Sequence, residues 1–334
     1  MIEKYEVVIG CEIHTQLLTK TKAFCACENK YGGMPDTRVC PVCLGLPGAM
    51  PRVSKGYVEL GAVAGLALNC DIATYTKFDR KHYFYPDLAK GYQITQYDLP
   101  LCTDGYVDLP FIHYPKDEQP GGEKHRSKNF KGEDCIIDNK YRRVRIERIH
   151  LEEDVGKSLH LEGKHSYIDY NRCGTPLIEI VTKPDFRSAE EVITYLKTLK
   201  SKLQFAGISE CEEGAMRCDI NISVRPEGSD VLGVRAEIKN MSSLTSIEEA
   251  INKEAIRHID ALERHTEVLV QETRRWDDVK KRTFPMRNKE TAADYRYFPD
   301  PNVMPVIIDD EWLESIKASM PATSSEQIEK YKSL

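Results

Sequence analysis

The sequence predicts an α+β fold built on an antiparallel or mixed sheet, and three features support this prediction. Several segments alternate apolar and polar residues with the period of a β-strand. Two other segments carry apolar residues three and four apart behind a serine that can cap a helix. The expected strands and helices do not alternate regularly along the chain, which favours an α+β arrangement over a parallel α/β fold.

The clearest strands lie in the second half of the chain. Residues 219–225 and 234–239 each place apolar side chains at every second position, and the turn-rich segment 226–233 links them. Because successive side chains of a strand point to opposite faces, we predict an antiparallel pair with one apolar and one densely polar face. Further strands are expected at 144–151 and 176–181.

Two helices are predicted from capping boxes. Ser188 with Glu191 opens the first, which should end at Gly207, and Ser246 with Glu249 opens the second. Both carry an apolar stripe that would pack on the sheet. The stripe residues are Val192, Leu196, Leu199 and Leu203 in the first helix, and Ile247, Ala250, Ile251, Ala255, Ile259 and Leu262 in the second.

Composition narrows the class of protein. The 334 residues, 41% hydrophobic and 30% charged, fit a soluble globular chain, and a net charge of -6 argues against a free-standing nucleic-acid binder. No apolar run approaches the roughly 18 residues of a membrane helix, and no signal peptide opens the chain. We therefore expect no membrane association and a cytoplasmic location. Seven of the eleven cysteines are scattered, as expected of reduced thiols.

The other four cysteines form two short pairs. Cys25 and Cys27 precede Cys40 and Cys43 by a twelve-residue gap, within a segment spanning about 22–48. This spacing is close to that of zinc ribbons, and soft thiolates in pairs suit tetrahedral zinc. The alternative is four free cysteines in a loop. A closed four-sulfur site has no open position, so we expect a structural role.

Carboxylates in predicted strands suggest a second metal site. Glu12 and His14 lie two residues apart and so share one face of an extended chain, and Glu179 interrupts an apolar strand. An unpaired buried carboxylate costs several kcal/mol, so a cation is expected near it. Asp219 and the run 152–154 add carboxylates that a divalent cation would neutralise, as in phosphoryl-transfer sites. Alternatively, 12–14 is a solvated strand end and 152–154 a solvated turn.

Basic residues occur in three further places. Segment 78–87 interleaves charges with aromatic residues, and is either a surface loop pinned by its rings or a loop in which Arg80 and Lys81 contact phosphate. The stretches 142–145 and 274–289 could contact an RNA backbone, although such runs are usually only solvated. No Walker-type loop is present, so any ATP site must use a less familiar fold.

Taken together, these segments resemble the B-subunit family of aspartyl/glutamyl-tRNA amidotransferases, GatB, across nearly the whole chain. The matching blocks are Gly10–His14, Cys40–Gly48, Phe78–Asp87, His150–Lys157, Asn171–Val181, Glu212–Pro226, Glu237–Asn240, Gln271–Arg274 and Asp294–Pro299. The resemblance implies an α+β cradle domain whose core is likened to glutamine synthetase.

The resemblance also implies an activity. ATP would phosphorylate the side-chain carboxylate of Glu-tRNA(Gln) and/or Asp-tRNA(Asn), and ammonia would displace the phosphate. A glutaminase A subunit would supply the ammonia, in a heterotrimer with a small C subunit. The implied Mg²⁺ ligands are Glu12, His14, Glu153, Glu179 and Asp219. The residues implied to contact ATP are Asp79, Arg80, Lys81, Arg225 and Lys239.

The resemblance implies a domain division as well. We expect a catalytic cradle at 1–298 and the start of a helical C-terminal domain at 299–334, because family members continue into a helical domain and a tail that grips tRNA. The chain stops at Leu334, so its own tRNA affinity should be reduced. One rival is the archaeal-type amidotransferase chain, whose large inserted domain does not fit here. Another is a non-catalytic zinc-bearing scaffold, which the five proposed metal ligands disfavour.

Overall fold

The computed structural model describes residues 4–113, 125–128, 134–160, 165–212, 214–286 and 292–321. Its main element is a ten-stranded sheet. Nine of the strands follow the order β15-β14-β13-β12-β1-β11-β8-β6-β2, and the tenth, β7, pairs with β8. The strands are β1 (Tyr5–Gln16), β2 (Asp71–Ile72), β6 (Cys102–His113), β7 (His125–Lys128), β8 (Asp134–Glu153), β11 (Pro176–Thr182), β12 (Met216–Pro226), β13 (Ala236–Lys239), β14 (Glu272–Asp277) and β15 (Arg282–Pro285). β13 and β14 run parallel and the other neighbours antiparallel, so the predicted mixed α+β sheet is confirmed.

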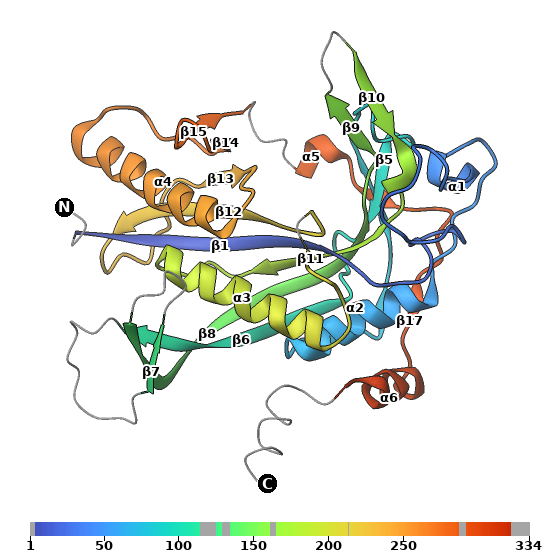
Figure 1. The fold of residues 1–334 in the computed structure, drawn as a ribbon, viewed down its shortest axis with the longest axis horizontal. Helices are drawn as coiled ribbons and strands as arrows, with labels where there is room; N and C mark the ends of the chain where they lie inside the picture. Colours follow the sequence, from blue (N-terminus) through green and yellow to red (C-terminus); the bar gives the residue numbers. More distant parts are fainter. Residues whose placement is uncertain are drawn as a thin grey trace.

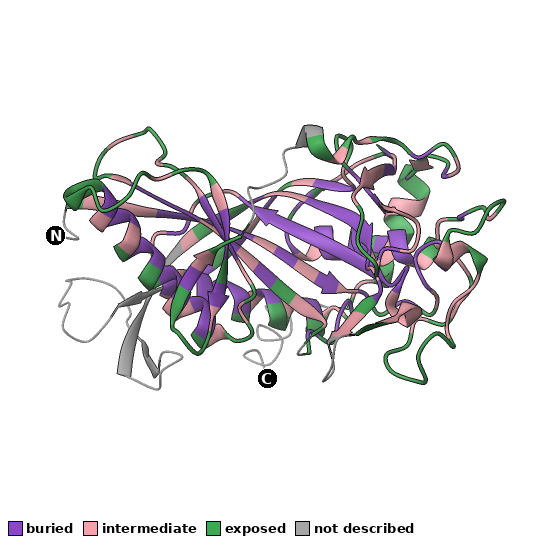
Figure 2. Cartoon of the chain, turned by 90° about the horizontal axis from the view of Figure 1, so that it is seen from above, coloured by how far each residue is buried: buried purple, intermediate pink, exposed green. Residues whose placement is uncertain are grey.

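Three helices cover one face of this sheet (Figure 1). They are α2 (Lys55–Ala67), α3 (Ala189–Phe205) and α4 (Leu244–Arg264). The sheet residues beneath them, such as Ile13, Ile178 and Ile220, are fully buried and form one core with the helical stripes. Figure 2 shows this burial running along the central strands. Since strand side chains alternate, the opposite face receives the polar residues of the same strands.

The helix predictions hold with one change. Ser188 caps α3, its side chain accepting the backbone N–H of Glu191, as predicted. In α4 the cap is Ser243 and not Ser246, because Ser243 Oγ accepts the Ser246 N–H at 3.0 Å while Ser246 Oγ donates to Asp278 at 2.6 Å. The helix therefore begins before the expected capping box.

Smaller elements gather beyond the C-terminal end of β1, at the right in Figure 1. They comprise a three-stranded sheet of β16, β4 and β5, the pairs β10–β9 and β17–β3, and the short helices α1, α5 and α6. Their bounds are α1 Pro41–Leu44, β3 Tyr75–Thr76, β4 Asp79–His82, β5 Tyr92–Thr95, β9 Lys157–His160, β10 Ser166–Asp169, α5 Ala292–Tyr295, β16 Phe298–Pro299, β17 Val306–Ile307 and α6 Asp310–Ser319. A turn of 3-10 helix spans Tyr170–Arg172.

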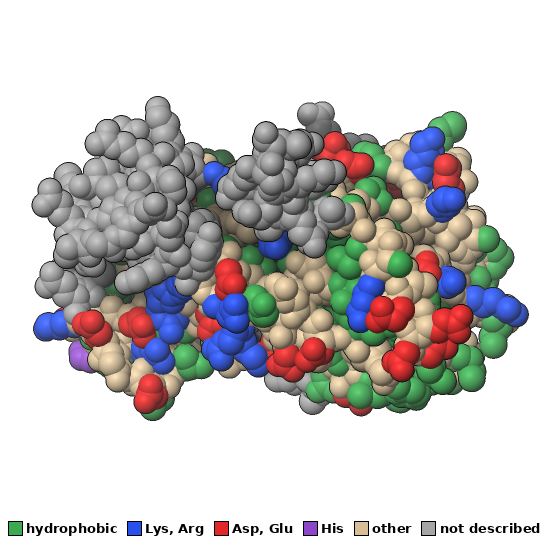
Figure 3. Space-filling view, turned by 90° about the horizontal axis from the view of Figure 1, so that it is seen from below, with side chains coloured by type: hydrophobic (Ala, Val, Ile, Leu, Met, Phe, Trp, Pro, Cys, Tyr) green, Lys and Arg blue, Asp and Glu red, His purple; other side chains and the backbone are tan. Residues whose placement is uncertain are grey.

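The chain after the predicted cradle boundary stays close to the sheet. The boundary at 298 falls inside β16, which pairs with β4, and α6 packs against α2. Residues 322–334 of the expected helical domain lie outside the described residues. Within the described ranges, no helix combines the length and apolar character needed to cross a membrane. Where described side chains can be seen from below, acidic and basic groups lie next to one another (Figure 3).

Candidate active site and metal centre

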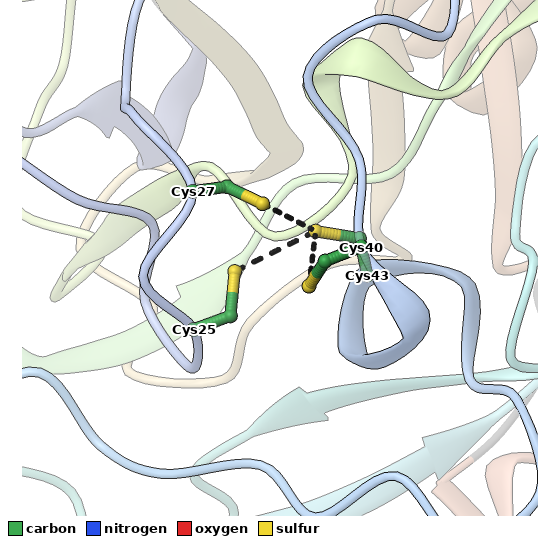
Figure 4. Close-up of side chains that lie close together, drawn as sticks. All are labelled: Cys25, Cys27, Cys40 and Cys43. Atoms are coloured by element: carbon green, nitrogen blue, oxygen red, sulfur yellow. Dashed lines mark hydrogen bonds between the residues drawn. The ribbon is translucent and has the colours of Figure 1, made fainter.

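The four clustered cysteines converge as their spacing predicts. Cys25 and Cys27 come from a loop, while Cys40 and Cys43 flank the first turn of α1 (Figure 4). The Sγ atom of Cys43 lies 3.6 Å from that of Cys25, 3.7 Å from that of Cys40 and 3.9 Å from that of Cys27. Four sulfurs about 2.3 Å from a central zinc would be roughly 3.8 Å apart, whereas disulfide sulfurs are about 2.05 Å apart. The cluster has the dimensions of a tetrahedral metal site.

A buried lysine accompanies this thiol cluster. Lys22 is 1% exposed, and its ammonium lies 2.7 Å from the carbonyl oxygen of Arg38 and 3.6 Å from Cys43 Sγ. A hydrogen bond from Cys25 lowers the pKa of Cys43, and the positive charge of Lys22 lowers it further. Burial raises this pKa, but the net result is a value of about 4. Because the thiolate is the form that binds metal, these contacts favour a metal ligand over a free thiol.

A second cluster lies on the polar face of the sheet, where β1, β11 and β8 are neighbours. Its ligand atoms come from His14, Glu179 and Glu152, and all lie within 4.8 Å of one another. His14 Nε2 is 3.3 Å from Glu152 Oε1 and 3.3 Å from Glu179 Oε2. His150 Nε2 lies 3.0 Å from Glu179 Oε2. Both carboxylates are buried, so their charges need these partners.

Strand register explains why these side chains meet. His14 is directly opposite Glu179, and Glu179 is directly opposite His150. Glu152 follows two residues after His150 on β8 and so shares its face. Cross-strand partners place their Cβ atoms about 5 Å apart. The cluster therefore depends on the pairing of three strands that are distant in sequence.

The electrostatics of the cluster favour ionised carboxylates. Burial raises the pKa of Glu179, but His150 and His14 outweigh it and hold this pKa well below its usual range. Burial likewise raises the pKa of Glu152, but His14 and Lys81 together hold this pKa below its usual value. Burial lowers the pKa of His14, yet the two carboxylates raise it well above its ordinary value. Positive charge is thus strongly favoured at this cluster.

Lys81 brings a cation to the same cluster from β4. Its ammonium lies 4.8 Å from the centre of the Tyr295 ring. Burial lowers the pKa of Lys81, but Tyr297, Glu152 and Glu179 together raise it. Of the residues predicted to contact phosphate in 78–87, Lys81 is the one that faces the carboxylates.

Glu153, predicted as a metal ligand, lies on the other side of β8. It pairs with Lys90 and accepts the backbone N–H of Ile94 at 2.9 Å. Lys90 in turn packs against Gly45, where φ is 63° and a Cβ would clash with the lysine side chain. Because neighbours on a strand point to opposite faces, Glu152 takes the position expected for Glu153. Glu153 instead links the sheet to the thiol lobe.

Glu12 and Asp219, also predicted ligands, lie one strand further along the polar face. They are cross-strand partners on β1 and β12. Asn221 Nδ2 donates to Glu12 Oε1 at 2.9 Å, and Lys239 Nζ donates to Asp219 Oδ2 at 2.6 Å. Glu12 lies two residues before His14 on the same strand. The Glu12–Asp219 pair is therefore beside the cluster of His14, Glu152 and Glu179 but does not belong to it.

The remaining residues predicted to contact ATP make internal contacts. Asp79 is buried and accepts the backbone N–H of Tyr97 at 3.0 Å. Arg80 Nε lies 2.8 Å from Asp300 Oδ2, and its guanidinium lies 4.1 Å from the Tyr92 ring centre. Arg225 forms an ion pair with Glu6 at 2.6 Å.

The arginines of the predicted basic stretch 142–145 each have a carboxylate partner. Arg143 pairs with Asp108 at 2.8 Å and Arg145 with Asp185 at 2.6 Å, while Arg142 pairs with Glu191. These ion pairs leave little net positive charge for an RNA backbone. Arg274, which opens the other stretch, is buried and pairs with Glu272 at 2.5 Å. Residues 287–289 of that stretch lie outside the described residues.

Sequence reasoning missed His150 as a member of the cluster, and it named Glu152 only as part of the run 152–154, with Glu153 as the expected ligand. The available signal was their spacing of two on one strand, the same spacing as Glu12 and His14. That signal fixes which residues share a face and leaves open which neighbouring strand they meet.

Comparison with known proteins gives a consistent family. Residues 7–314 match the family described as "GatB/GatE catalytic domain". The B subunit (numbered 1) of the aspartyl/glutamyl-tRNA(Asn/Gln) amidotransferase of Clostridium acetobutylicum is 49% identical over 330 residues, covering 98% of this chain and 64% of that protein. The B subunit of the same enzyme of Caldicellulosiruptor saccharolyticus is 49% identical over 331 residues, covering 98% and 63% respectively.

A third relative extends the range of organisms. The corresponding B subunit of Thermodesulfovibrio yellowstonii is 46% identical over 330 residues, covering 98% of this chain and 64% of that protein. The chain thus spans somewhat less than two thirds of the length of these curated relatives. Because the family match covers nearly the whole chain, the chain belongs to the GatB/GatE catalytic-domain family.

Proposed function

We propose that this chain is the catalytic region of the B subunit of a tRNA-dependent amidotransferase, acting on Glu-tRNA(Gln) and/or Asp-tRNA(Asn). The relatives named above carry this activity in their names. In the first step the side-chain carboxylate would take the γ-phosphoryl group of ATP, giving an acyl phosphate and ADP. In the second step ammonia would attack the acyl carbon, and the bond to the phosphate oxygen would break to release inorganic phosphate and the amide.

The main support is the convergence of Glu179, Glu152 and His14, together with the electrostatic interaction of Lys81 with both carboxylates. A carboxylate is a poor acyl donor, and phosphoryl transfer to it develops negative charge that must be neutralised. Two ionised carboxylate oxygens are the donors that Mg²⁺ prefers, and an imidazole nitrogen extends the fit to Mn²⁺. A divalent cation bound there would neutralise phosphate charge.

The chain's own residues would complete the site. Glu179 and Glu152 would hold the cation, and His150, hydrogen-bonded to Glu179, would fix the orientation of that carboxylate. The Lys81 ammonium would contact phosphate oxygens from the opposite side. Glu12 and Asp219, one strand away, would hold a further cation or orient Lys239 toward the nucleotide.

The thiol cluster would hold zinc in a structural role. Cys25, Cys27, Cys40 and Cys43 supply four sulfurs and leave no open position for a substrate. Zinc there would tie the 22–48 lobe together. Lys90 connects this lobe to Glu153 and hence to β8.

Ammonia would come from a partner. We propose that a glutaminase A subunit and a small C subunit assemble with this chain and that mischarged tRNA binds across the complex. A high concentration of ammonium salt would then support slow amidation without the glutaminase, because the acyl phosphate needs only a nucleophile.

The decisive experiment replaces Glu179 in the assembled complex. Glu179→Gln keeps the shape and removes the charge, so amidation should fall at least about 100-fold, the scale for losing one group that stabilises transition-state charge. Glutamine hydrolysis by the partner should remain measurable. Glu147→Gln, which alters an exposed ion pair on β8, is the matched control. Near-normal amidation by Glu179→Gln would favour a non-catalytic scaffold.

A further inference from the structure

The hairpin formed by β14 and β15 carries an aromatic ring surrounded by cations. The Phe284 ring centre lies 4.5 Å from the Arg282 guanidinium, 5.0 Å from the Lys280 ammonium and 5.6 Å from the Arg275 guanidinium. All three cations are exposed, and the ring is half-buried. We call Phe284 and these three residues the hairpin platform.

The hairpin platform differs from the other basic stretch in how its cations are paired. Among the described residues, no carboxylate forms an ion pair with Arg275, Lys280 or Arg282. The adjacent Asp277 uses Oδ1 to accept the backbone N–H groups of Lys280 and Val279, at 2.9 Å and 3.1 Å. Lys281 points elsewhere and pairs with Glu249 at 2.6 Å. Asp277 lies directly opposite Arg282 and interacts electrostatically with Lys280 and Arg275. One carboxylate therefore stands beside three cations, and the hairpin platform keeps a net positive charge on a chain whose net charge is -6.

The hairpin platform faces the same side of the sheet as the carboxylate cluster. Phe284 is directly opposite Arg275, and Arg275 is directly opposite Lys239. Lys239 contacts Asp219, which is opposite Glu12 on β1. Partners in register share a face, and four strand spacings separate β1 from β15, a distance of about 19 Å. That is the length of roughly six stacked nucleotides at ~3.4 Å each.

The chemistry of the hairpin platform selects its ligand. An aromatic ring surrounded by Arg and Lys can stack with a nucleobase while the cations contact the neighbouring phosphates. Proteins that bind single-stranded nucleic acids use this combination. An acidic peptide would use the cations but has no need of the ring. A duplex would use the cations and hide its base faces.

We propose that the hairpin platform binds a single-stranded RNA segment and guides its end along the polar face toward His14, Glu152 and Glu179. The identity of RNA as ligand rests on the proposed function. The binding test below does not require that activity.

The test measures binding of a short fluorescent single-stranded RNA to the purified chain by anisotropy at low salt. Stacking of one base is worth about 1–3 kcal/mol, so Phe284→Leu should weaken binding about 5- to 150-fold. Phe284→Tyr keeps an aromatic face and should bind within about threefold of the unaltered chain. The double variant Arg275→Gln with Arg282→Gln should reduce the slope of log K against log salt by about 1.4, which is 0.7 for each of two phosphates.

Two controls separate this site from general charge. Lys281→Gln removes a cation from the same hairpin, and Arg143→Gln removes one from the ion-paired stretch; neither should change affinity by more than about twofold. Thermal melting of each variant checks that it is folded. The inference is overturned if the unaltered chain does not bind, or if Phe284→Leu binds as well as Phe284→Tyr.

Further outcomes distinguish this inference from the proposed function. If the platform variants bind RNA normally but fail to assemble with the partner proteins, the platform is a protein interface and the inference is wrong. If they lose RNA binding while the unaltered complex amidates no mischarged tRNA, the inference stands and the proposed function falls.

Discussion

The thiol cluster and the carboxylate cluster each bring candidate ligand atoms within 4.8 Å of one another, and they do so by opposite means. The cysteines come from one short segment, Cys25 to Cys43, held by a loop and the first turn of α1. His14, Glu152 and Glu179 come from three strands joined by sheet register. The first arrangement is local and closed, as suits a structural site. The second is assembled from distant segments and offers carboxylate oxygens and an imidazole nitrogen, as suits a catalytic metal site.

Both clusters also place a lysine beside their negative charges, again with different geometry. Lys22 is buried and donates to Cys43 and to a backbone carbonyl, so its position is fixed. Lys81 lies against the rings of Tyr83 and Tyr295 without an ion pair of hydrogen-bond length among the described residues. We infer that Lys22 balances charge permanently, whereas Lys81 is free to contact a bound phosphate.

The largest effect should come from breaking the closed cluster. Cys43 is central to the four sulfurs, so Cys43→Ser should abolish tight zinc binding and loosen the segment 22–48. Structural zinc contributes about 10–16 kcal/mol in small zinc domains, which makes this the costliest single change. Metal analysis and limited proteolysis measure the two effects.

The control for this prediction is a buried cysteine in another part of the core. Cys102→Ala should keep the zinc, because Cys102 is on β6 and its thiol contacts the carbonyl oxygen of Gly61 in α2 and none of the clustered cysteines. If carefully purified unaltered chain holds no zinc and all four clustered thiols titrate freely, the assignment fails.

A smaller and more specific effect should separate the two faces of β8. Glu152→Gln should lower amidation by the complex about 100-fold and weaken Mn²⁺ binding by the chain, because Glu152 is a cluster ligand. Glu153→Gln should leave Mn²⁺ binding intact and destabilise the fold by about 3 kcal/mol, since it breaks a buried pair with Lys90. Calorimetric titration and urea unfolding give the two readouts. A loss of Mn²⁺ affinity confined to Glu153→Gln would restore the sequence-based assignment.

The same comparison shows what the sequence could predict. The thiol cluster could be read from spacing alone, because its four ligands are local in the chain. The helix over Ala189–Phe205 and the pair β12–β13 followed from capping and period-two patterns, which are also local. Glu179 was singled out because a carboxylate in an apolar strand needs a partner.

The features that the sequence left open depend on strand register and on contacts between distant segments. The choice between Glu152 and Glu153 depends on which residue of β8 faces β11, and this is set by the pairing of Glu179 with His150. The ion pairs of Arg143 and Arg145 depend on Asp108 and Asp185, which belong to other segments. Basic residues in 142–145 and 274–289 looked alike in sequence and differ in structure, because contacts with distant strands, loops and helices decide which charges are neutralised.

The smallest expected effect concerns the lysine of the closed cluster. Four thiolates around Zn²⁺ carry excess negative charge, and Lys22, 1% exposed and 3.6 Å from Cys43 Sγ, is placed to offset it. Lys22→Met keeps an apolar stem and removes the charge, so zinc affinity should fall about tenfold, the lower end of the range for groups that contact a metal ligand. Competition with a chromophoric chelator measures this. Lys20→Met, at an exposed position two residues earlier, should leave the affinity unchanged, and so should Lys81→Met, whose charge serves the other cluster. If Lys22→Met holds zinc as tightly as Lys20→Met, the buried ammonium stabilises the loop through Arg38 alone, and the parallel between the two lysines is lost.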